Sequence, residues 1–186
     1  MKGRRICLGV TGCIAAYKSA EIASRLVQAG AEVTVVMTES ATHLVGPITF
    51  EALTGRPVYA QMWESHAPFA MEHIAVADWA EVVLVAPATG NIIGKAASGI
   101  ADDLLSTVIM TVDVPVMFAP AMNTRMWKNP IVQANVERLR KAGYHFVEPE
   151  EGNLACGAVG VGRLADPQRI IAALAELLHV TPPKAL

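Results

Sequence analysis

The sequence predicts one α/β domain of the Rossmann or flavodoxin-like class, a three-layer sandwich whose doubly wound parallel sheet is covered by helices on both faces. Short apolar runs recur along the chain and are continuous rather than alternating, which is typical of strands buried on both faces. Longer amphipathic or alanine-rich stretches separate these runs, as crossover helices would. The length of 186 residues suits a single domain of about 100–200 residues.

Five apolar runs are the expected strands, at residues 4–10, 32–37, 82–86, 114–119 and, more weakly, 145–147. After the first strand, Gly12 opens a helix that we expect over residues 14–28, and Gly30 suits the left-handed position just past its end. Residues 58–71 show no clear period. A long irregular segment inside a compact domain is typical of a lid or binding loop.

The last expected helix has clear signals at its start. Asp166 is a favourable N-cap, and Pro167 suits the first helical position because a missing N–H is harmless there. We expect the domain to span residues 1–179. Residues 180–186 contain two adjacent prolines and indicate a tail or the start of an interdomain linker.

Composition and charge exclude several classes of protein. Fifteen Lys and Arg against 17 Asp and Glu give a net charge of −2, so we expect neither nucleic acid nor a membrane as a partner. We also expect no membrane-spanning segment and no secretory signal. Three cysteines, an odd number, favour a reducing compartment, and we expect a cytoplasmic protein. No His or Cys pair has ligand spacing, so no metal is expected.

In a parallel sheet, ligands bind where the strands end. The first strand is followed by Gly12-Cys13-Ile14, where glycine lets the backbone approach an anion and free N–H groups at a helix start attract phosphate; a plain tight turn is the alternative. After the second strand, Thr38 and Ser40 suit either a phosphate or a helix cap. No acidic residue closes that strand to hold a ribose hydroxyl, which argues against NAD.

Two further strand ends carry similar turns. Pro87 precedes Thr89-Gly90-Asn91, and Pro120 precedes Ala121 and Asn123. An Asn amide both donates and accepts hydrogen bonds, which suits a flavin edge or the amide and carboxylate of a substrate. Taken alone, each Asn is more often a helix cap. Two such turns at adjacent strand ends favour a shared site.

One histidine and one cysteine stand out beyond these turns. His73 precedes an apolar segment, where a lone histidine is usually a surface or capping residue. Cys156 lies between Asn153 and Arg163, in a stretch with three glycines. A structural cysteine normally packs in a strand or helix, so a thiol in a glycine-rich loop is placed to reach a ligand.

Together these segments resemble the flavin-dependent cysteine decarboxylases, and within them the phosphopantothenoylcysteine decarboxylases of coenzyme A biosynthesis. The resemblance runs in order from residue 2 to residue 178, and its most specific signatures are Pro-Ala-Met-Asn and Ala-Cys-Gly. The segments that carry it are Gly12-Cys13-Ile14-Ala15-Ala16-Tyr17-Lys18, His73-Ile74 with Trp79-Ala80, Pro87-Ala88-Thr89-Gly90-Asn91, Gly99-Ile100-Ala101-Asp102-Asp103-Leu104-Leu105-Ser106, Pro120-Ala121-Met122-Asn123 with Met126-Trp127, and Leu154-Ala155-Cys156-Gly157 through Gly162-Arg163.

The resemblance implies FMN as the cofactor and a role for each of these residues. It places the flavin phosphate near Gly12, Cys13, Ile14, Thr38 and Ser40, and the rest of the flavin among Thr89, Gly90, Asn91, Ile92 and Ala121. His73 resembles the family's catalytic base, Asn123 its contact for the substrate carboxylate, and Cys156 its proton donor on a flexible flap. The flap would be lined toward the substrate by Asn153, Leu154 and Ala155.

The reaction that the resemblance implies is FMN-dependent conversion of 4′-phosphopantothenoylcysteine to 4′-phosphopantetheine. The substrate thiol is oxidised to a thioaldehyde, carbon dioxide leaves, and the resulting enethiol is reduced. The resemblance further implies a homo-oligomer built from trimers, up to a dodecamer. A hydrophobic fraction of 53%, above the usual share of about 45–50%, agrees with apolar surface in a subunit interface.

Several alternatives stay open on the sequence. A flavin prenyltransferase would have the same sheet and FMN site, although such proteins lack the two specific signatures. A peptidyl-cysteine decarboxylase would release an enethiol, and a non-catalytic regulatory subunit of a phosphatase would keep only the fold. The chain could also be a complete decarboxylase or the N-terminal half of a bifunctional enzyme that in addition ligates cysteine to phosphopantothenate.

Overall fold

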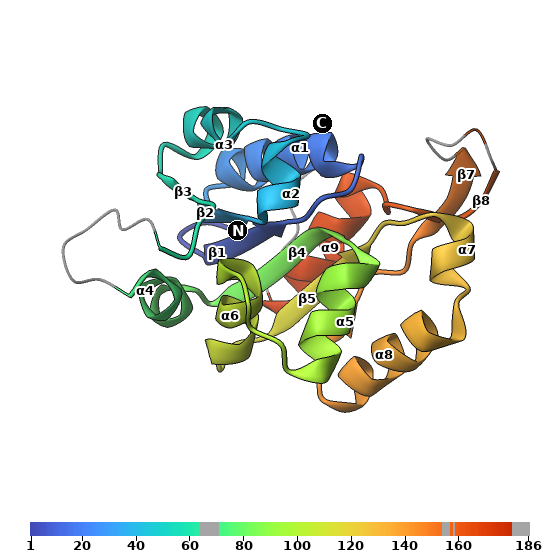
Figure 1. Cartoon of the computed structure of the whole chain (residues 1–186). Coiled ribbons are helices and arrows are strands. Elements are labelled where there is room, and N and C mark those ends of the chain that lie inside the picture. Colours follow the sequence, from blue (N-terminus) through green and yellow to red (C-terminus); the bar gives the residue numbers. More distant parts are fainter. Residues whose placement is uncertain (64–70, 154–156, 158, 180–186) are drawn as a thin grey trace.

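A six-stranded parallel sheet forms the centre of the molecule, in the order β3-β2-β1-β4-β5-β6 (Figure 1). The computed structural model describes residues 1–63, 71–153, 157 and 159–179. The strands of this sheet are β1 (Arg5–Val10), β2 (Glu32–Met37), β3 (Val58–Tyr59), β4 (Val82–Ala88), β5 (Val116–Pro120) and β6 (His145–Phe146). Their pairings are all parallel, which confirms the predicted doubly wound sheet.

Helices cover the sheet on both faces and complete the three predicted layers. They are α1 (Ala16–Gln28), α2 (Glu39–Thr42), α3 (Pro47–Thr54), α4 (Glu72–Trp79), α5 (Gly90–Ser98), α6 (Leu104–Thr111), α7 (Thr124–Trp127), α8 (Pro130–Lys141) and α9 (Pro167–Leu177). Buried residues of α1, α3 and α9 pack on one face of the sheet, and those of α4, α5, α6 and α8 pack on the other. None of the helices in the described part of the chain is long and apolar enough to cross a membrane.

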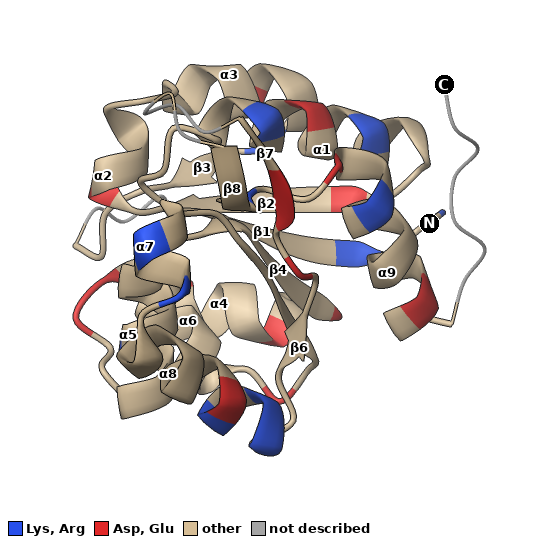
Figure 2. Ribbon diagram, turned by 90° about the vertical axis from the view of Figure 1, so that its right-hand side faces the viewer, with Lys and Arg blue, Asp and Glu red and all other residues tan. Residues whose placement is uncertain are grey.

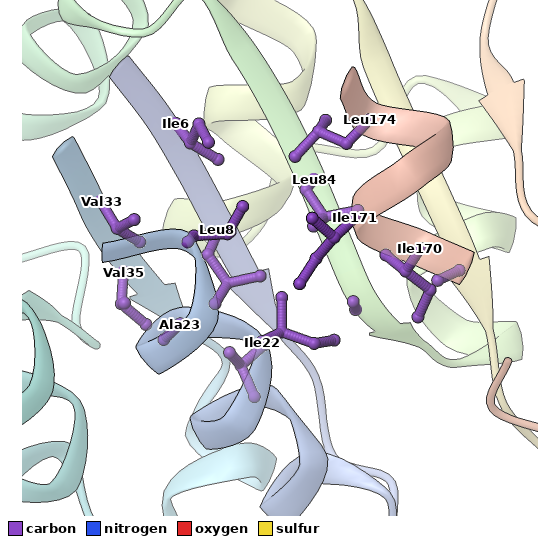
Figure 3. Packing of buried hydrophobic residues seen from close by; sticks show 14 of the residues in the cluster. Ile6, Leu8, Ile22, Ala23, Val33, Val35, Leu84, Ile170, Ile171 and Leu174 are labelled. Carbon is purple, nitrogen blue, oxygen red and sulfur yellow. The ribbon is translucent and has the colours of Figure 1, made fainter. Parts of the chain in front are cut away.

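The strands were predictable because both of their faces are buried. All seven residues of β4 are buried, and side chains of β1 alternate between the two cores, with Ile6 and Leu8 on one side and Cys7 on the other. Figure 3 shows Ile6 and Leu8 facing the apolar side chains of α1 and α9. Continuous apolar sequence is therefore the expected signature of these strands.

The predicted helix ends are largely confirmed. Gly30 follows α1 with φ of +84°, a conformation that favours glycine. Asp166 caps α9 by accepting a hydrogen bond from the backbone N–H of Gln168 at 2.8 Å, with Pro167 as the first helical residue. The start of the first helix differs: α1 begins at Ala16, two residues later than expected, because a turn intervenes.

The structure differs from the sequence-based prediction in one region. Residues 153–163 were expected to form an irregular glycine-rich loop. In the structure, β7 (Glu150–Asn153) and β8 (Val159–Arg163) pair as an antiparallel hairpin. Residues 58 and 59 of the expected irregular segment form β3, and residues 64–70 lie outside the described part. The predicted tail, residues 180–186, also lies outside it, so its assignment as a linker stays a prediction.

Candidate functional site

The order in which strands are added to the sheet reverses between two parallel central strands, β1 and β4. Strands β2 and β3 lie on one side of β1, and strands β4, β5 and β6 lie on the other side. In doubly wound sheets, the loops diverge at such a point and leave a crevice at the carboxyl ends of the strands. The turns that follow β1 and β4 are therefore expected to border a ligand site.

A cavity of about 560 Å³ lies at this end of the molecule, within the range of small-molecule sites. Three segments line it: the start of α1, the turn after β5, and the β7–β8 hairpin. Its lining residues are Cys13, Ile14, Ala15, Tyr17, Lys18, Ala121, Met122, Asn123, Asn153, Gly162, Arg163 and Leu164. The structure thus brings together five of the predicted site residues, namely Cys13, Ile14, Ala121, Asn123 and Asn153.

The turns after β1 and β2 touch each other at Gly12. A Cβ atom on Gly12 would lie 2.4 Å from the Cβ of Ser40, so any side chain larger than hydrogen would displace the start of α2. Thr38 occupies the N-cap position of α2 but makes no side-chain capping bond. Its buried Oγ1 has no hydrogen-bond partner within the described residues, which argues against the capping alternative.

This arrangement fits a phosphate group. A buried hydroxyl without a partner carries a desolvation penalty that a bound acceptor would remove. Thr38 supplies this hydroxyl, Ser40 supplies an exposed one, and the glycine at position 12 keeps the backbone accessible. The three predicted phosphate positions Gly12, Thr38 and Ser40 therefore form one surface.

Cys13 contributes a neutral thiol to the cavity wall. Burial raises the pKa of its thiol above the ordinary value, and a hydrogen bond from the backbone of Ala15 offsets part of that rise. Cys7 is fully buried in β1, where burial raises the pKa of its thiol to about 12. The prediction that Cys7 packs in the core is confirmed by its burial.

The two predicted asparagine turns lie side by side. The backbone N–H of Ala121 donates to the carbonyl of Ala88 at 3.0 Å, and a Cβ on Gly90 would lie 3.7 Å from the sulfur of Met122. Asn123 is the N-cap of α7, and its Oδ1 accepts a hydrogen bond from the N–H of Arg125 at 2.8 Å. Asn123 therefore both caps a helix and lines the cavity.

Asn91, unlike Asn123, does not cap a helix. It is the second residue of α5 and is exposed, whereas the cap of that helix is Thr89, whose Oγ1 accepts from the N–H of Ile92 at 3.3 Å. The side chain of Ile92 is 1% exposed and packs in the core. The predicted flavin contacts at Thr89, Gly90, Asn91 and Ile92 thus occupy one turn beside the cavity wall, and they stay predictions.

The β7–β8 hairpin packs directly on the turn that carries Asn123. The N–H of Met122 donates to the carbonyl of Gly162 at 2.9 Å, and a Cβ on Gly160 would lie 2.5 Å from Oγ1 of Thr124. The glycines that made this stretch look irregular in sequence are the residues that allow this contact. Leu154, Ala155 and Cys156 lie outside the described residues, so their predicted roles stay predictions.

His73 lies far from these residues within one chain. It is half-buried at the start of α4. Figure 1 shows α4 at the left of the molecule and α7 with the hairpin at the right. The structure therefore does not bring His73 to Asn123 in a single chain.

Two cations in the cavity wall were not predicted from the sequence to contact a ligand. Lys18 and Arg163 line the cavity, and neither forms an ion pair with an acidic residue in the described part of the chain. A signal existed for Lys18: it stands in the first turn of α1, where the helix dipole disfavours a positive charge. Elsewhere on this side of the molecule, basic and acidic residues are interspersed (Figure 2).

Comparison with known proteins identifies the family of this chain. The sequence model of the family described as "Flavoprotein" matches residues 1–179. The bifunctional coenzyme A biosynthesis protein CoaBC of Bacillus subtilis (strain 168) is 49% identical over 171 residues, 92% of this chain and 42% of that protein. A probable phosphopantothenoylcysteine decarboxylase of Streptococcus mutans is 41% identical over 177 residues, 94% of this chain and 99% of that protein.

Similar solved structures agree with these sequence matches. A mutant PPC decarboxylase complexed with pantothenoylaminoethenethiol superposes with a TM-score of 0.86 at 30% identity, covering 96% of this chain and 100% of that one. The FMN-dependent cysteine decarboxylase SpaF superposes with a TM-score of 0.82 at 37% identity, covering 95% and 96%. The chain spans less than half the length of the CoaBC relatives that it matches. The resemblance seen in the sequence motifs is confirmed, and the chain belongs to the flavoprotein family.

Proposed function

We propose that this chain is an FMN-dependent decarboxylase that converts 4′-phosphopantothenoylcysteine to 4′-phosphopantetheine in coenzyme A biosynthesis. The observation that carries the proposal is a cavity lined by Asn123 and by two cations, Lys18 and Arg163, beside a phosphate-fitting surface. Neither cation has an ion-pair partner among the described residues. Support comes from the Streptococcus mutans relative, which is named as a probable phosphopantothenoylcysteine decarboxylase. The relative complexed with pantothenoylaminoethenethiol supports it as well.

FMN is the proposed form of the flavin because the site offers a place for a terminal phosphate. Thr38 and Ser40 would donate hydrogen bonds to that phosphate, and Gly12 would leave its backbone open to it. When bound, the flavin supplies an acceptor and a donor for the two electrons of the substrate thiol. The overall reaction replaces the carboxylate by a proton and releases carbon dioxide, so it consumes no external oxidant or reductant.

Asn123 would bind the substrate carboxylate. Its Oδ1 holds the N–H of Arg125, which fixes the plane of the amide at the cavity wall, and an amide nitrogen donates hydrogen bonds. The hairpin contact through Gly162 holds the backbone of the same turn. Asn123 would therefore orient the substrate without first losing side-chain freedom.

Lys18 and Arg163 would bind the phosphate of the substrate. Among the residues that the structure describes, the lining of the cavity contains these two cations and no acidic residue, so its charge suits an anionic ligand. Hydrogen bonds between cations and phosphate oxygens are among the stronger ones in proteins. The pair would distinguish the phosphorylated substrate from a peptide that ends in cysteine.

A second copy of the chain would supply His73. The proposed base and the proposed carboxylate contact lie on opposite sides of one chain, so both can act on one substrate only across a subunit interface. Exposed apolar residues occur near both: Met71 and Ile74 flank His73, and Ile14 and Met126 lie near the cavity. These exposed apolar residues support a homo-oligomer, and we propose that it is built from trimers, as the resemblance implies.

The proposal is tested with the purified protein. We expect its absorption spectrum to show a bound flavin that mass spectrometry identifies as FMN, and we expect added 4′-phosphopantothenoylcysteine to yield 4′-phosphopantetheine and carbon dioxide. A peptide with a C-terminal cysteine serves as the competing substrate. Protein that releases no carbon dioxide from the phosphorylated substrate, even with FMN added, would overturn the proposal.

A further inference from the structure

The side chain of Thr11 makes two hydrogen bonds that link β1 to β4, the adjacent strands between which the strand order of the sheet changes direction. It is the residue directly after β1 and is 1% exposed. Its Oγ1 donates to the carbonyl oxygen of Pro87 at 2.7 Å and accepts from the backbone N–H of Thr89 at 3.1 Å. The hydroxyl thus uses both its donor and its acceptor capacity on one turn.

This link begins where the backbone pairing of the two strands stops. The register of β1 with β4 runs from Ile6 opposite Val82 to Gly9 opposite Val85. Two residues further on, Pro87 has no N–H to donate, and the chain turns toward α5. Beyond this point the two strands are connected by the Thr11 side chain, through its hydrogen bonds to Pro87 and Thr89.

The two segments that the link aligns are the ones that would enclose the flavin. Gly12-Cys13-Ile14 follows Thr11 directly, and Thr89 begins the turn of Gly90 and Asn91. Thr89 in turn caps α5 through the N–H of Ile92. A shift of Thr11 would therefore also shift the start of α5. A displacement of that turn by a few tenths of an ångström would alter the fit of a rigid ligand.

We propose that Thr11 is a positioning residue for the flavin site, which sets the turn after β4 relative to the phosphate-fitting turn after β1. The role rests on the proposed function, because it presumes that a flavin occupies both turns. Thr11 acts through the backbone of Thr89, and its effect should appear in the affinity for FMN rather than only in stability.

The test compares Thr11→Val, which removes both hydrogen bonds, with Thr11→Ser, which keeps the hydroxyl. Ser19→Ala is the matched control: the Ser19 hydroxyl is also fully buried and donates to β4, to the carbonyl of Ala86 at 2.6 Å, but it does not bond to the turn. Dissociation constants are measured by quenching of FMN fluorescence on the apoprotein, together with its thermal midpoint. We expect Thr11→Val to weaken FMN binding by about tenfold or more, and the other two variants to stay within about threefold of the parent.

Three results would overturn the positioning role. The first is FMN affinity of Thr11→Val within threefold of the parent, the second is an equal loss in Ser19→Ala, and the third is an equal loss in Thr11→Ser. Should Thr11→Val not fold, Thr11→Ala takes its place, because it removes the same bonds without adding a methyl group at the hydroxyl position. A parent protein that binds no FMN would overturn the proposed function itself, and this outcome is distinct from the other three.

Discussion

Gly162 lies against the carbonyl oxygen of Met122 so closely that a Cβ atom would come within 2.2 Å of it. The hydrogen bond from the N–H of Met122 to the carbonyl of Gly162 joins the same two residues. The hairpin and the turn that carries Asn123 therefore form one unit, and the shape of the cavity depends on both.

The first prediction concerns this contact. Gly162→Ala adds a side chain at φ of +139° and pushes β8 off the turn, so we expect a loss of stability of roughly 1–3 kcal/mol and a higher KM for the substrate. Val159→Ala on the same strand is the control, because Val159 is 71% exposed. Thermal unfolding and steady-state kinetics measure both. Unchanged KM in the Gly162 variant would show that the hairpin does not shape the site.

The second prediction concerns the cations of the cavity. Lys18→Met and Arg163→Met should each raise KM for 4′-phosphopantothenoylcysteine by about tenfold or more, because each removes a charge-assisted hydrogen bond to phosphate. KM for the dephosphorylated substrate should change little. Arg138→Met, on the exposed face of α8, is the control. Equal effects on both substrates would contradict a phosphate-binding role.

The third prediction concerns the buried hydroxyl of Thr38. Thr38→Val removes a polar atom that has no partner within the described residues, so the apoprotein should be as stable as the parent or more stable. Binding of FMN should nevertheless weaken by about tenfold, whereas binding of riboflavin, which lacks the phosphate, should not change. Thermal midpoints and fluorescence titrations with both flavins give these values. Equal weakening for riboflavin would place the hydroxyl away from the phosphate.

The fourth prediction concerns the two sides of the subunit interface. A His73→Asn chain and an Asn123→Ala chain should each be inactive alone, yet oligomers that contain both should regain activity. Some interfaces then join an intact His73 with an intact Asn123. Activity of verified mixed oligomers measures this effect, and mixing two batches of one variant is the control. Mixed oligomers without any recovery would contradict the placement of His73 in a neighbouring copy's site.

The fifth prediction concerns pH and the link between α5 and α6. Asp103 is partly buried, which raises the pKa of its carboxyl, but hydrogen bonds from Lys95 and Ser106 outweigh burial and hold that pKa below the ordinary value. The stabilisation it provides is therefore full above the ordinary carboxyl pKa and is lost as the pH falls through the lower folded value. Asp103→Asn should reduce the loss of unfolding free energy on acidification, measured by urea unfolding across acidic pH. The same slope in the variant and the parent would refute this account.

The parts of the fold that the sequence predicted are those whose signal is local. Val82 to Ala86 is apolar throughout because both faces of β4 are buried, and Asp166 with Pro167 marks a helix start in any context. The hairpin gave no such signal. Its glycines do not distinguish a strand from a loop in the sequence. Besides its pairing with β7, β8 contacts residues 122–124, which are far away in the chain.

The same distinction applies to the site. The place of Asn123 in the cavity wall was predictable because similar turns follow two adjacent strands, whose carboxyl ends meet at one edge of the sheet. Arg163 joins Lys18 only because the hairpin folds back toward α1, and the link between Thr11 and Thr89 depends on the register of β1 with β4. Interactions of this kind become visible only when the strands are placed side by side.

The most direct test of the account is mass spectrometry of the reaction of the purified protein with 4′-phosphopantothenoylcysteine, with FMN identified in the same sample. The account predicts bound FMN and accumulation of 4′-phosphopantetheine, the saturated thiol that has lost carbon dioxide. Unchanged substrate in the presence of bound FMN would contradict the proposed activity.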